Sequence, residues 1–147
     1  MKKIAILVIA ALMSVVALAR DPELKIPYSQ LPEQAQQFLT QYFAANPVKN
    51  TTQKFDDGVS EYKAYLKGGI IVEFDMLGGW DEIWLTRGGN MPRMILPDIV
   101  QETLDSRFGD KRIYKMENNG YEYKIKFTDR TEVEINMNGQ ITEFEYD

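Results

Sequence analysis

The stretch V-E-F-D-M-L-G-G-W at residues 72–80 returns, 61 positions later, as V-E-I-N-M-N-G-Q-I at residues 133–141. The same shift aligns Glu61-Tyr62-Lys63 with Glu122-Tyr123-Lys124. Asn and Gly tolerate positive φ, so the ends of both stretches are typical of tight hairpin turns. An ordered series of matches along two halves of a chain indicates an internal duplication.

The start of each copy carries a second match. Leu31-Pro32 aligns with Leu96-Pro97, here at a shift of 65 rather than 61. The first copy therefore contains four additional residues between Val48 and Glu61. They lie either in the Asn46-Pro47 segment or in the Asp56-Asp57-Gly58 turn, and the sequence leaves both alternatives open.

Two periodicities follow one another within each copy. After each Leu-Pro pair, apolar residues recur at gaps of three and four, which predicts an amphipathic helix with proline in its first turn. The later part alternates with period two, as in residues 121–127, which predicts strands with one buried face and one solvated face. We expect these strands near residues 51–56, 61–67, 70–76 and 80–85, and again near 112–117, 121–128, 131–136 and 140–146.

These elements predict the fold class. One copy of roughly 55 residues would bury little core by itself. We therefore predict an α+β fold in which two tandem helix-plus-four-strand repeats, about residues 27–85 and 92–147, form one antiparallel sheet with both helices on one face. Residues 86–95 are the expected linker, and residues 20–147 form a single domain.

The N-terminal residues indicate export. Lys2 and Lys3 precede an apolar run that ends in Ala17-x-Ala19, the layout of a secretory signal peptide over residues 1–19 that is cleaved after Ala19. A retained membrane anchor is the alternative, but the apolar run of about 16 residues is shorter than the roughly 20 of a spanning helix. We expect a periplasmic or secreted protein that is not a lipoprotein, because the chain has no cysteine.

Charge and composition exclude several classes of function. Without Lys2 and Lys3, 15 basic residues face 22 acidic ones, a formal charge of −7. An acidic chain gains no counterion-release affinity for nucleic acid and is repelled by anionic membranes, so we expect neither as a partner. The chain also has no histidine, which excludes Ser-His-Asp and Cys-His catalysis and the usual zinc, copper and haem ligation.

Carboxylate catalysis and metal binding by oxygen ligands remain possible. The 22 acidic residues are scattered, many at the solvated positions of strands, so they do not predict a carboxylate enzyme. Asp56-Asp57-Gly58 and Asn136-Met137-Asn138-Gly139 offer calcium ligands but lack the spacing of an EF-hand, which favours plain turns. We expect no enzyme, no catalytic residue, no cofactor and no metal.

The Leu-Pro helix starts, the Tyr-containing strands and the doubled V-E-[FI]-[DN]-x-x-G hairpin resemble the PepSY-like family of exported bacterial proteins, also called beta-lactamase-inhibitor-protein-like. The resemblance covers the mature chain. It implies a two-repeat α+β fold outside the cytoplasm, no enzymatic activity and another protein as partner. Ile135 and Asn136 replace Phe74 and Asp75 in the second copy, which argues against a shared active site at Asp75.

The difference between the copies predicts a binding surface. If Tyr62, Ala64 and Leu66 face the helices, the outer face of the first copy carries more apolar and aromatic groups than that of the second. Exposed aromatic groups on a sheet face are common anchors for partners. The predicted partner-binding residues are Tyr65, Ile71, Trp80 and Trp84. Alternation alone leaves open whether Trp80 and Trp84 or their neighbours Ile83 and Leu85 face outward. In the alternative reading, Trp80 lies in the core opposite Ile141, and long neighbouring side chains cover Tyr65 and Ile71.

Together these features predict a non-catalytic exported protein-binding module. It would act through the open sheet face, as an inhibitor or modulator of a hydrolase, in keeping with the resemblance. The alternative is a periplasmic protein that binds a small ligand or a metal.

Overall fold

The computed structural model describes residues 22–146, so the expected signal peptide and its cleavage site lie outside the described residues. The strands of the described chain are β1 (Leu24–Ile26), β2 (Val48–Asp56), β3 (Val59–Leu66), β4 (Ile70–Phe74), β5 (Trp80–Leu85), β6 (Ile113–Asn118), β7 (Glu122–Phe127), β8 (Thr131–Asn136) and β9 (Ile141–Tyr146). The helices are α2 (Glu33–Tyr42) and α3 (Asp98–Phe108), each preceded by a single 3₁₀ turn, η1 (Tyr28–Gln30) and η2 (Arg93–Ile95). Pro32 and Pro97 stand immediately before α2 and α3.

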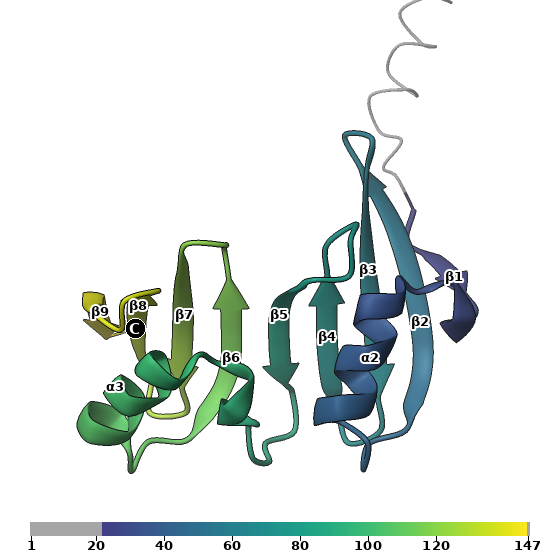
Figure 1. The fold of residues 1–147 in the computed structure, drawn as a ribbon. Coiled ribbons are helices and arrows are strands. Elements are labelled where there is room, and N and C mark those ends of the chain that lie inside the picture. Colours follow the sequence, from purple (N-terminus) through teal and green to yellow (C-terminus); the bar gives the residue numbers. More distant parts are fainter. Residues whose placement is uncertain (1–21, 147) are drawn as a thin grey trace, which may run out of the picture.

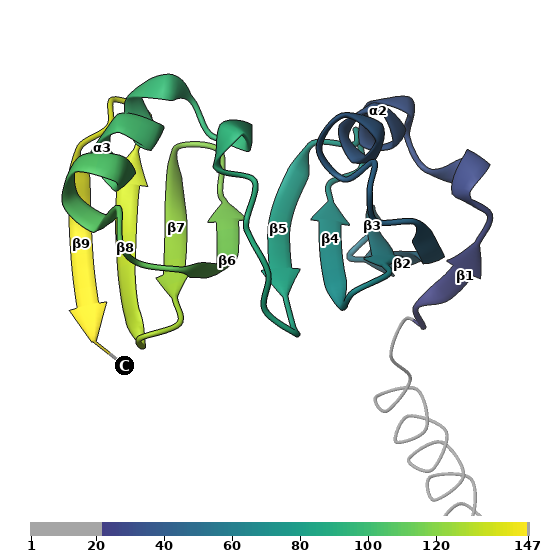
Figure 2. The same ribbon diagram turned by 90° about the horizontal axis from the view of Figure 1, so that it is seen from below.

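All nine strands form one antiparallel sheet in chain order, from β1 at one edge to β9 at the other (Figure 1). Both helices cover the same face of this sheet and leave its other face open (Figure 2). The predicted fold class is therefore confirmed. The ninth strand, β1, is an addition: it has three residues, too few to show a period in the sequence, and it pairs with the outer edge of β2.

The two copies share one sheet because β5, the last strand of the first copy, pairs directly with β6, the first strand of the second. The pairs are Glu82 with Glu117, Ile83 with Met116, and Trp84 with Lys115. Ile83 and Met116 are fully buried and belong to one core cluster with side chains from both copies. The junction thus supplies the core that one copy alone would lack.

The four additional residues of the first copy lie at the tip of the hairpin between β2 and β3. Gln53 pairs with Tyr62, and its counterpart Asn118 pairs with Tyr123. Eight residues, 54–61, separate the first pair, whereas four residues, 119–122, separate the second. Of the two alternatives left open by the sequence, the turn is correct, and in Figure 1 this hairpin extends beyond its neighbours.

The hairpin in the stretch 72–80 explains why its residues recur. One oxygen, Oδ1 of Asp75, accepts hydrogen bonds from the backbone N–H groups of Leu77 and Gly79, both at 2.9 Å. In the second copy, Oδ1 of Asn136 accepts from Asn138 and Gln140 at 3.0 Å. Both side chains supply the same acceptor, so Asp and Asn exchange freely here.

The glycine that follows in each hairpin lies directly against the helix of its own copy. Gly78 has φ +90°, and a Cβ built there would lie 2.8 Å from the backbone nitrogen of Ala35 in α2. Gly139 has φ +79°, and its Cβ would lie 2.8 Å from Cγ1 and 2.9 Å from the carbonyl oxygen of Ile99 in α3. Only glycine permits both the turn and this close approach of helix and sheet.

This contact yields a stability prediction. We expect Gly139→Ala to lower the free energy of unfolding by about 2 to 4 kcal/mol, because positive φ and crowding against α3 add. Gly58→Ala is the matched control: Gly58 has the same φ of +79°, but nothing lies within 4 Å of its Cβ position. It should cost only the conformational part, about 1 to 2 kcal/mol. Urea unfolding measures both, and equal losses would contradict the packing role of Gly139.

The open face of the sheet as candidate functional site

The register of the strands arranges many side chains of the open face in two rows, one that runs from β1 to β9 and one that runs from β2 to β9. They alternate with a buried row, Thr51, Ala64, Val72, Ile83, Met116, Ile125 and Val133, that faces the helices. The charged row consists of Lys25, Thr52, Lys63, Glu73, Glu82, Glu117, Lys124, Glu134 and Glu143. The aromatic row consists of Asn50, Tyr65, Ile71, Trp84, Lys115, Lys126, Glu132 and Glu145.

Three of the four predicted partner-binding residues are neighbours on the aromatic row. Tyr65 pairs with Ile71, and Ile71 pairs with Trp84, so their side chains form a continuous apolar strip across β3, β4 and β5. Trp84 is 41% exposed. We call Tyr65, Ile71 and Trp84 the anchor strip. One end of it is held by Glu23, which accepts a hydrogen bond from the Tyr65 hydroxyl at 2.7 Å.

The fourth predicted residue, Trp80, does not belong to this surface. Its indole lies on the helix-covered face, between Phe38 of α2 at 6.4 Å and Tyr123 of β7 at 5.9 Å, both stacked. The cause is a bulge: β4 residues 73 and 74 pair with residues 82 and 80, so Asp81 is an extra residue in β5. Without it, Trp80 and Trp84 would share a face; with it, they lie on opposite faces.

Lys115 completes the strip from the second copy. Its Nζ lies 5.6 Å from the ring centre of Trp84 and 2.9 Å from Oε1 of Glu82. Such a cation over an indole contributes about 0.5 to 1 kcal/mol at an exposed site and orients the ring. Sequence reasoning missed this residue, since Lys115 meets Trp84 only through the pairing of β5 with β6.

The second copy presents ion pairs where the first presents the anchor strip. Lys124 Nζ lies 3.2 Å from Glu134 and 3.4 Å from Glu132, and Lys126 Nζ lies 3.5 Å from Glu132. The hydrogen bond to Glu134 raises the pKa of Lys124. No aromatic side chain lies on the charged or aromatic row of this copy. The expected asymmetry between the two outer faces is therefore present.

The extra residue of β5 creates an acidic corner of the open face. Partial burial raises the pKa of Asp81 to about 6, and the charges of Asp75, Glu61 and Glu73 add to this effect. Within residues 22–146, however, no three His, Cys, Asp or Glu side chains are grouped closely enough to hold a metal ion.

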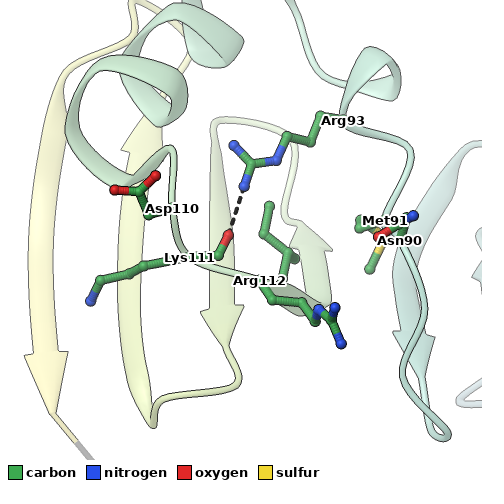
Figure 3. A pocket seen from close by; sticks show the side chains of 7 residues that line it. Asn90, Met91, Arg93, Asp110, Lys111 and Arg112 are labelled. Atoms are coloured by element: carbon green, nitrogen blue, oxygen red, sulfur yellow. Dashed lines mark hydrogen bonds between the residues drawn. The ribbon is translucent and has the colours of Figure 1, made fainter.

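A hollow of about 300 Å³ lies where the linker meets the start of β6, as Figure 3 shows. Three basic residues line it, but two are engaged within the protein. Arg93 donates to the carbonyl oxygen of Lys111 at 2.8 Å and pairs with Asp105 at 3.2 Å. Lys111 Nζ lies 2.9 Å from Asp129. The side chain of Arg112 points away from Arg93 (Figure 3), so the hollow offers no convergent charge for an anion.

The two tryptophans should respond differently to substitution. We expect Trp80→Ala to cost about 2 to 3 kcal/mol of folding stability, and Trp84→Ala less than about 1 kcal/mol, because only the former leaves a gap beside the core. In Trp84→Phe, the remaining Trp80 should emit at shorter wavelength and resist quenching by acrylamide. In Trp80→Phe, Trp84 should be readily quenched. The reverse order would contradict the assignment of faces.

The raised pKa of Asp81 predicts a pH dependence. The folded protein binds a proton more tightly at Asp81 than the unfolded chain does, so this group destabilises the fold increasingly as the pH rises from about 4 to 6. We expect Asp81→Asn to raise the melting temperature at about pH 7.5 and to have no such effect near pH 4. Asp110→Asn, at an exposed aspartate in the turn that follows α3, is the control. A gain of equal size at both pH values would contradict the prediction.

Comparison with solved structures identifies relatives of the same fold. A "putative calcium-regulated periplasmic protein" from Bacteroides thetaiotaomicron matches with a TM-score of 0.77 and 26% identity, over 84% of this chain and 96% of that one. Two structures from Bacteroides vulgatus, each described as a "putative periplasmic protein", match with TM-scores of 0.78 and 0.77. They are 24% and 20% identical, and the matches cover 86% and 84% of this chain and 99% of each of theirs. At these identities, the two Bacteroides vulgatus structures support a shared fold only.

No curated protein matches the chain. A family model described as "Putative beta-lactamase-inhibitor-like, PepSY-like" matches residues 60–143, from β3 of the first copy to β9 of the second. No catalytic family is indicated. In the described residues, no helix is long and apolar enough to cross a membrane. With more than half of its length matched, and with the doubled hairpin inside the match, the chain belongs to the PepSY-like, beta-lactamase-inhibitor-like family.

Proposed function

We propose that this chain is a non-catalytic periplasmic protein that binds another protein through the anchor strip. The observation that carries the proposal is the strip itself: Tyr65, Ile71 and Trp84 adjoin one another on a face whose other positions are mostly charged. Tyrosine and tryptophan are the residues most often found to dominate binding energy at protein interfaces. A flat apolar strip with a charged surround fits a protein surface better than a small molecule.

The charged residues around the strip indicate the chemistry of the partner. The two rows of the open face hold more glutamates than lysines, and the acidic corner at Asp81 lies beyond the charged row that borders the strip. The lysines nearest the strip are already paired, Lys63 with Glu73 at 2.8 Å and Lys115 with Glu82 at 2.9 Å. A partner with one apolar projection between basic residues would be complementary in shape and charge.

The family and the relatives support the location and the kind of partner. The similar structures are described as periplasmic, which agrees with the signal peptide expected over residues 1–19. The family description refers to a protein inhibitor of a hydrolase, and on this basis we infer inhibition or modulation of a hydrolase. A role without catalysis agrees with a chain that has neither histidine nor cysteine.

The alternative is a periplasmic protein that binds a small ligand or a metal. One similar structure is described as calcium-regulated, and a cation near Asp81 would reduce the repulsion of Asp81 by Asp75, Glu61 and Glu73. The absence of a group of three such ligands within residues 22–146 makes this function the weaker one. Calorimetric titration with calcium, with Asp81→Asn as comparison, separates this alternative from the proposed protein-binding function.

We expect photo-crosslinking residues placed at positions 71 and 84 to capture the same basic periplasmic protein in cells. With that protein purified, Trp84→Ala should weaken binding by at least about tenfold, as loss of an interface anchor does. Met94→Ala is the matched control, because Met94 is 68% exposed but lies in η2, away from the strip. Equal affinities of the Trp84 and Met94 variants would exclude the strip as the binding surface.

A further inference from the structure

We propose that the outer edge of β9 is a second docking surface, which accepts an extended basic strand of a partner protein by adding it to the sheet. Within residues 22–146, β9 pairs only with β8 and forms the edge of the sheet opposite β1 (Figure 1). The backbone groups on its outer side are free to form a ladder with another strand. This surface is separate from the anchor strip.

The first copy shows what kind of strand pairs with the equivalent edge, the outer edge of β5. β9 is the counterpart of β5, at the shift of 61 residues, and both contain the same bulge, at Asp81 and at Thr142. The outer edge of β5 is occupied by β6, with Met116 beside Ile83 and Lys115 beside Trp84. The described chain supplies no strand in the corresponding place beside β9.

Among residues 22–146, the charged side chains of the open face also lack a partner at the outer edge of β9. Glu73 and Glu82 stand opposite each other, but each has a lysine on its far side, Lys63 at 2.8 Å and Lys115 at 2.9 Å. Glu134 and Glu143 are the corresponding pair in the second copy. Only Glu134 has its lysine, Lys124 at 3.2 Å.

The far side of Glu143 is the open edge of the sheet. In residues 22–146, neither Glu143 nor Glu145 forms an ion pair. A hydrogen bond with Glu145, together with the charges of Glu145 and Glu134, raises the pKa of Glu143. Like charges side by side on a strand repel one another, and lysines on an adjoining strand would pair with both carboxylates.

The opposite face of the same edge offers an apolar contact. Phe144 stacks on Phe108 of α3 at 5.6 Å and is still 41% exposed. Tyr146 meets the Phe144 ring edge-on at 5.4 Å and is 78% exposed. An apolar residue of an added strand would cover Phe144 as Met116 covers Ile83.

The occupant is therefore a strand in which lysine or arginine alternates with apolar residues. Lys124-Ile125-Lys126 of β7 shows the pattern within this sheet, since its lysines pair with Glu132 and Glu134 of β8. A second copy docked edge to edge through its own β9 fits poorly, because the glutamates of both copies would face each other. This argues against a symmetric contact of two copies through β9, and we assign the added strand to a different protein.

The test uses a short peptide of alternating lysine and isoleucine, about seven residues long, with a glutamate-for-lysine peptide as comparison. We expect the lysine peptide to bind and to slow amide hydrogen exchange in residues 141–146, and the glutamate peptide not to bind. Glu143→Gln/Glu145→Gln should weaken binding by at least about tenfold. Both residues are exposed, so the variant should fold normally, which its melting temperature checks.

Two controls separate strand addition from general attraction of a basic peptide to an acidic protein. Glu33→Gln/Glu102→Gln removes the same charge from the exposed sides of α2 and α3 and should leave binding unchanged. A peptide methylated at every backbone nitrogen of its central residues keeps its charge but cannot form a ladder along either edge, and it should not bind.

Three results would overturn the proposal. The first is equal loss of binding in the two double variants. The second is full binding of the methylated peptide, or protection that appears elsewhere than in residues 141–146. The third is self-association of the chain, in the absence of peptide, that depends on Glu143 and Glu145, since it would assign the edge to a second copy.

Discussion

The pairing of β5 with β6 is the interaction on which the rest of this structure depends. It consists of three residue pairs, yet it joins two units that are each too small to bury a core of their own. Ile83 and Met116 carry the core across the junction, and both are fully buried. The same junction seats Trp80 against Tyr123 of the second copy and brings Lys115 over Trp84 of the first. The contact between copies therefore contributes to both the interior and the open face.

The bulges decide which side chains reach which face. A single extra residue, Asp81, rotates the first residue of β5 toward the helices while the end of the strand keeps Trp84 outside. The equivalent bulge at Thr142 gives β9 the same geometry. The two copies thus share the same backbone arrangement, whereas their open faces differ. The first copy carries an apolar strip, and the second carries a network of ion pairs between lysines and glutamates. This division allows one sheet to offer two different surfaces.

Periodicity and repetition predicted most of the fold. The helices, the eight principal strands and the turns were predictable because each depends on local pattern: gaps of three and four, alternation by two, and glycine or asparagine at the reversals. β1 was not predictable, because Leu24–Ile26 is too short to show a period and becomes a strand only beside β2. For the candidate site, alternation and the alignment of the two copies assigned Tyr65 and Ile71 to the outer face, whereas for Trp80 and Trp84 alternation predicted only that they share a face. The same rule failed for Trp80, since alternation assumes a strand without a bulge.

By itself, the sequence determined the duplication, the class of fold and the exclusion of histidine and cysteine chemistry, because each of these depends on composition or on short-range order along the chain. The tertiary structure alone decided that Trp80 packs against the core and that Lys115 completes the anchor strip. It also decided that, among residues 22–146, Glu143 and Glu145 stand at a sheet edge without an ion-pair partner. These facts depend on which strands become neighbours and on where a strand carries an extra residue. Neither is set by local pattern; both arise from the packing of the two copies against each other.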